Sequence, residues 1–61
     1  MKEQLIAEVQ RVKSVLEAVE RNGEKMRAAM IAYKIKEAER VLWFAGERTM
    51  GQWVKELEGI V

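Results

Sequence analysis

The sequence contains no cysteine, histidine, aspartate or proline. Without cysteine it can form no disulfide, and without cysteine or histidine it lacks the ligands of the usual structural zinc sites. Histidine is also the most frequent general base in enzymes, and no side chain here has an obvious base beside it to make it a nucleophile. We therefore expect no catalytic residue, no metal site and no cofactor.

Charge of one sign and long hydrophobic runs are also missing. Eleven Lys and Arg residues oppose ten acidic residues, so the formal net charge is only +1. A chain this close to neutral exerts no global attraction on nucleic acid or anionic lipid. The longest uninterrupted apolar run, residues 41–45, is far too short to cross a bilayer, and the N-terminal residues do not resemble a signal peptide. We expect a cytoplasmic protein with no membrane partner.

The residues that are present are those of self-associating helices. Hydrophobic residues make up 49% of the 61 positions, and Ala, Val, Leu, Met, Glu, Lys and Arg dominate. A chain of this length buries only about 60% of its unfolded surface and is marginally stable alone. Small domains recover stability from disulfides, a metal or oligomerisation. The composition therefore favours association with itself or with another protein.

The N-terminal third has the periodicity of a helix that faces another helix. Five apolar residues follow a strict 4-3-4-3 spacing, which is the heptad pattern: Leu5, Val9, Val12, Leu16 and Val19. We predict a helix over residues 3–21. Asn22-Gly23 follows, and both residues tolerate the left-handed conformation that ends a helix. We favour a hairpin turn there, although a single long helix through Gly23 is also compatible with the spacing.

The second predicted helix, residues 24–45, is apolar on two lines. One line repeats at heptad spacing and includes Ile31, Ile35 and Leu42. The other line contains Met26, Met30, Tyr33, Val41 and Phe44. A helix in a two-helix hairpin needs only one buried face. The second line therefore indicates more neighbours than one hairpin supplies.

A short third helix is predicted over residues 50–58. Gly46 marks a break before it, and Thr49 to Gln52 fits the capping-box pattern, in which the two side chains satisfy each other's backbone N–H groups.

The predicted fold is all-α and forms one small helical domain over residues 1–61. It consists of an antiparallel helical hairpin and the short C-terminal helix. We expect a homodimer in which two hairpins form a four-helix-bundle core and the short helices cap it. The residues expected in the oligomer core are Leu5, Val9, Val12, Leu16, Val19, Ile31, Ile35 and Leu42.

Glu37 interrupts the second apolar line and has two interpretations. The one we favour places it at a rim, in an ion pair with Lys34 or Arg40. The other makes it a buried polar residue that fixes the register or orientation of a partner.

Arg40, Trp43 and Phe44 are the candidate partner-binding residues. They cluster near the end of the second helix and combine the aromatic and guanidinium groups that dominate interface energetics. Trp43 also departs from the helix's core periodicity. Either the third helix covers it, which we slightly favour, or it is exposed as an anchor for a partner.

These patterns favour a small protein-interaction or assembly module that acts as a homo-oligomer and catalyses nothing. One alternative is a small DNA-associated regulator, of bacterial or phage type, because residues 41–57 faintly resemble a helix-turn-helix and residues 25–40 are modestly basic. Gly51 and Gln52 weaken that resemblance, so a nucleic-acid partner is not expected. The other alternative is a designed helical bundle, which the missing residue types would suit.

Overall fold

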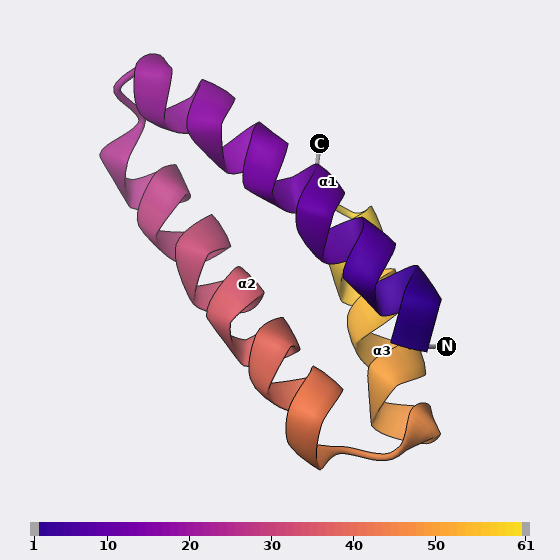
Figure 1. Ribbon diagram of the computed structural model, residues 1–61. Helices are drawn as coiled ribbons and strands as arrows, with labels where there is room; N and C mark the ends of the chain where they lie inside the picture. Colours follow the sequence, from indigo (N-terminus) through magenta and orange to yellow (C-terminus); the bar gives the residue numbers. More distant parts are fainter. Residues whose placement is uncertain (1, 61) are drawn as a thin grey trace.

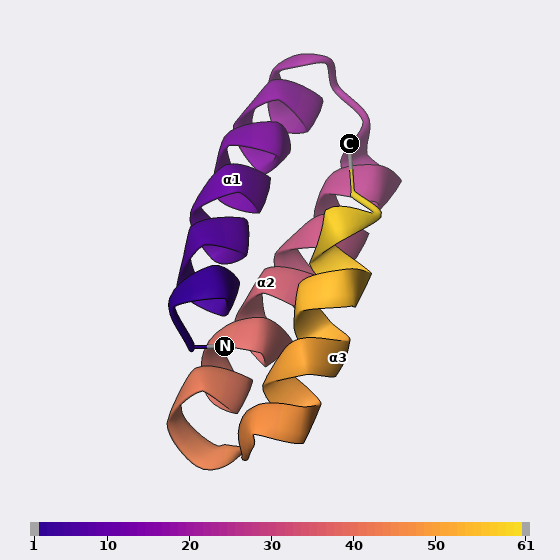
Figure 2. The same cartoon turned by 90° about the vertical axis from the view of Figure 1, so that its right-hand side faces the viewer.

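The computed structural model describes residues 2–60, and Met1 and Val61 of the expected domain lie outside them. These residues form α1 (Lys2–Arg21), α2 (Lys25–Phe44) and α3 (Glu47–Glu58). The helices α1 and α2 form an antiparallel hairpin, and α3 turns back to lie along both of them (Figures 1 and 2). The predicted all-α fold is confirmed. In the chain itself α3 is the third member of a bundle and does not cap the end of the hairpin.

The turn between α1 and α2 is a glycine-dependent helix stop. Gly23 has a φ of +76° and is the only described residue with a positive φ. Its N–H donates to the carbonyl of Glu20 at 3.0 Å, and the N–H of Glu24 donates to the carbonyl of Val19 at 3.3 Å. This pair of bonds is the Schellman motif, which satisfies the last carbonyls of α1. The hairpin is therefore confirmed, and the single long helix is wrong.

The heptad positions pack inside the single chain. Of the residues expected in the oligomer core, only Leu16 and Leu42 are partly buried, and the other six are fully buried. Ala28 and Ala38 complete the contact from α2, and Met50 and Leu57 bring α3 onto the same core. The buried residues are Leu5, Val9, Val12, Val19, Ala28, Ile31, Ile35, Ala38, Met50 and Leu57.

The third helix starts three residues earlier than predicted. Gly46 is its N-cap, with φ −82° and ψ 176°, and no side chain caps the helix. The first backbone bond runs from the N–H of Met50 to the carbonyl of Gly46 at 3.1 Å. The predicted capping box at Thr49 is therefore wrong. Because α3 starts at Glu47, it has about one more helical turn than predicted. Glu47 then lies in the first turn, where the helix dipole favours an acidic residue.

Polar contacts connect each pair of helices. Arg11 of α1 donates to the carbonyl oxygens of Leu57 at 2.7 Å and Ile60 at 2.9 Å, at the end of α3. Its Nε also lies 3.0 Å from a carboxylate oxygen of Glu8. Two ion pairs complete the set, each at 3.1 Å: Lys13–Glu39 between α1 and α2, and Lys34–Glu56 between α2 and α3. Arg11 thus binds two carbonyls at the end of α3, and the Leu57 carbonyl accepts a backbone hydrogen bond from the N–H of Ile60 as well.

Candidate functional site

Large apolar side chains remain exposed on one side of the bundle. Six of them are exposed among the described residues, and five of these six belong to α2. Four lie on one face of that helix and keep the spacing of the second apolar line: Met26 (89% exposed), Met30 (55%), Tyr33 (61%) and Phe44 (87%). We call these four residues the apolar line of α2. The third helix leaves this line uncovered.

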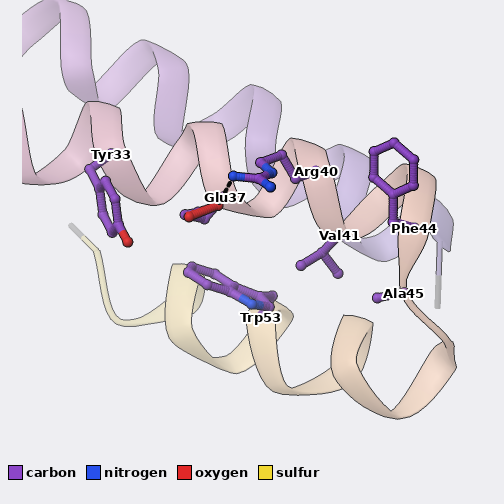
Figure 3. A pocket seen from close by; sticks show the side chains of 7 residues that line it. All are labelled: Tyr33, Glu37, Arg40, Val41, Phe44, Ala45 and Trp53. Atoms are coloured by element: carbon purple, nitrogen blue, oxygen red, sulfur yellow. Dashed lines mark ion pairs between the residues drawn. The ribbon is translucent and has the colours of Figure 1, made fainter.

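An open groove runs beside the apolar line, where α2 and α3 approach each other. Its volume is about 500 Å³. Most of its wall comes from α2, and the ring of Trp53 faces that wall from α3 (Figure 3). The lining residues are Tyr33, Glu37, Arg40, Val41, Phe44, Ala45 and Trp53. We call this feature the α2–α3 groove.

The two charges in the groove belong to neighbouring turns of α2. A guanidinium nitrogen of Arg40 lies 3.7 Å from a carboxylate oxygen of Glu37 (Figure 3). The Glu37 side chain is 28% exposed and that of Arg40 is 68% exposed. The expected ion pair of Glu37 with Arg40 is confirmed, whereas Lys34 pairs with Glu56 instead. The groove therefore contains an ion pair without net charge, and it lies between Tyr33 and Phe44 along α2.

The structure separates the three predicted partner-binding residues. Arg40 and Phe44 line the groove, and Trp43 does not. Trp43 is 77% exposed, so the expectation that the third helix covers it is wrong. Successive residues of a helix point about 100° apart, and α3 lies on the Val41 side of α2, away from Trp43. The Lys2 ammonium lies over its indole ring, 5.8 Å from the ring centre.

Four groove residues were not among the predicted site residues: Tyr33, Val41, Ala45 and Trp53. The spacing of the second apolar line already contained a signal for Tyr33 and Val41. The periodicity of the third helix placed Trp53 on an apolar face. The position of that face beside Val41 depends on how α3 packs, and no local pattern specifies it.

The groove offers contact area and one ion pair, and it has no buried polar side chain. Within residues 2–60 no charged or polar residue is buried, and no group of three acidic side chains could hold a metal ion. No helix in this range combines the length and the apolar character needed to cross a bilayer. A surface of this kind binds through shape and apolar contact.

None of the family models, curated proteins or solved structures compared with the chain matches it. The function proposed below is therefore inferred from the surface of α2 and α3 alone.

Proposed function

We propose that this protein is a small interaction module that assembles with itself through the apolar line of α2 and the α2–α3 groove. The observation that carries the proposal is the exposure of four large apolar side chains on one face of a single helix. Large contiguous apolar patches on a small protein mark interaction surfaces. Met and aromatic residues, which make up this line, are enriched in protein interfaces.

The dimensions of the chain allow an interface along α2. A standard interface covers about 800 Å² of each partner. The accessible surface of the chain is 4475 Å², so such an interface would occupy roughly a fifth of it. The helix α2 has 20 residues and is about 30 Å long. Pairing of two α2 helices, flanked by two α3 helices, would create a four-helix centre, which differs from the core of two hairpins expected from the sequence.

The physical reason for self-association is the small core. Among residues 2–60 ten side chains are buried, and a chain of 61 residues is marginally stable alone. Binding a second copy in the folded state alone adds stability by mass action. Covering the apolar line also removes from water the side chains that the monomer leaves exposed.

Sedimentation equilibrium at micromolar concentration tests the proposal, with a matched pair of variants. We expect the wild-type chain to sediment as a dimer. Phe44→Glu places a charge in the groove and should weaken association by about tenfold or more. Trp43→Glu is the control, because Trp43 is an equally exposed aromatic residue of the same helix end outside the groove. It should leave the mass unchanged.

A wild-type chain that stays monomeric over the whole concentration range would refute the proposed self-association. Equal weakening by both variants would show that the groove is not the binding surface.

A further inference from the structure

The groove residues of α2 form a self-complementary series. Tyr33 lies four residues before Glu37, and Phe44 lies four residues after Arg40. The pair Tyr33 and Phe44 therefore has the same midpoint along the helix as the pair Glu37 and Arg40. Reversal of the helix about this midpoint places glutamate where arginine was and one aromatic residue where the other was.

We propose that a second copy docks antiparallel on α2, with a two-fold axis through the midpoint between Glu37 and Arg40. Each Glu37 then faces Arg40 of the second copy, and each Tyr33 faces Phe44 of the second copy. The two α2 helices overlap over residues 33–44, so the interface contains Tyr33 and Phe44 of the apolar line, and Met26 and Met30 lie beyond the overlap. A two-fold interface requires this reciprocity, since each contact occurs twice. The inference rests on the proposed self-association and specifies its geometry.

Other arrangements of two α2 helices place like charges together or leave both charges opposite uncharged side chains. Parallel docking puts Glu37 against Glu37 and Arg40 against Arg40. An antiparallel arrangement with the two-fold axis at Glu37 places Glu37 opposite Glu37. An axis at Arg40 likewise places Arg40 opposite Arg40. A larger shift brings Tyr33 opposite Glu37 and leaves Arg40 against Met30. Like charges in an interface suppress the wrong register.

The existing ion pair is compatible with an exchange of partners. Glu37 and Arg40 are only loosely paired within the chain, at 3.7 Å, and Arg40 is mostly exposed. Its guanidinium can therefore contact the carboxylate of a second copy while it stays close to its own. The centre of the dimer then contains two carboxylates and two guanidiniums, so no net charge is buried. Buried ion pairs persist when every charge has a partner.

The test is a charge-reversal mixture. In the Glu37→Arg dimer, each new arginine faces Arg40 of the second copy. In the Arg40→Glu dimer, each new glutamate faces Glu37 of the second copy. Each variant alone should associate at least about tenfold more weakly than the wild type. An equimolar mixture should form a heterodimer of near wild-type affinity, because every opposed pair then has opposite signs. Native mass spectrometry separates the three dimers by mass.

The intrachain ion pair cannot explain such a rescue, because neither variant contains it. Lys36→Glu is the control for the charge reversal, since Lys36 is exposed on α2 outside the groove. It should dimerise like the wild type. Circular dichroism must show the same helicity for all chains, which substitutions at exposed or partly exposed positions should preserve.

The outcomes separate this inference from the proposed function. If the wild type dimerises and the mixture shows no rescue, the antiparallel geometry is wrong and the self-association stands. If single variants dimerise normally, the geometry is equally wrong. If the wild type is monomeric, the proposed function fails and this inference fails with it.

Discussion

Among the described residues, Arg11 forms side-chain hydrogen bonds that join distant parts of the sequence. It lies in the first helix and binds backbone oxygens of Leu57 and Ile60, near the end of the chain. The last carbonyls of a helix lack intrahelical partners, and they carry the negative end of its dipole. A partly buried guanidinium therefore contributes both hydrogen bonds and a favourable charge at this point.

We predict that Arg11→Ala lowers the free energy of unfolding by about 1–2 kcal/mol, because it removes charge-assisted hydrogen bonds to these carbonyls. Urea denaturation followed by circular dichroism measures the effect. Arg21→Ala is the control, since the pair of Arg21 with Glu17 is 3.8 Å long and both side chains are more than 70% exposed. It should change stability by less than about 0.5 kcal/mol. Equal effects would mean that Arg11 contributes no more than a surface charge.

The ends of the helices show how one residue type serves two different purposes. Gly23 ends α1 with a φ of +76°, a conformation that costs other residues energy. Gly46 opens α3 with extended backbone angles that any residue can adopt, and an added Cβ there would meet nothing within 4 Å. The first glycine is therefore required by its conformation, and the second is not.

The same substitution at these two glycines should have opposite effects. Gly23→Ser forces a side chain into the left-handed region and should destabilise the fold by about 1 kcal/mol. Gly46→Ser supplies an N-cap hydroxyl and reduces the freedom of the unfolded chain, so it should stabilise the fold by about 0.5 kcal/mol. Thermal melts at one fixed protein concentration compare the two. A loss of stability in both variants would contradict the assignment of Gly46 as a replaceable N-cap.

At the scale of the whole molecule, local spacing predicted the parts of the fold that depend on local geometry. Val9, Val12 and Ile31 are buried because helical periodicity places them on one face wherever the helix packs. The Asn22-Gly23 turn was likewise visible as a pair of residues that accept the left-handed conformation.

The remaining features depend on how the three helices pack, and spacing says little about that. Trp43 is exposed because α3 packs on the other side of α2. No spacing pattern identifies the contacts of Arg11, because its partners lie near the other end of the sequence. The groove also depends on packing. Phe44 and Arg40 were predicted as partner-binding residues, whereas Trp53 lines the groove because of how α3 packs on α2.

Because α3 is short, we expect it to be less stable than the hairpin of α1 and α2. The helix has 12 residues, and isolated helices of about this length are marginal in water. Its attachment depends on Met50, Leu57 and the Arg11 bonds. Amide hydrogen exchange should therefore show α3 opening at a lower free energy than the hairpin, with Leu57 exchanging faster than Val12 or Ile35. Uniform protection across the three helices would instead indicate one cooperative unit.

This opening reaches the proposed interaction surface, because Trp53 forms the α3 side of the groove. Molecules with α3 detached would keep the apolar line of α2 but lose that wall. The fraction of chains competent to bind would then equal the fraction with α3 docked. Because both copies of a dimer must be competent, the apparent association constant would fall with the square of that fraction. A substitution that never touches the groove, such as one at Leu57, could thereby control association through the population of a partly open state.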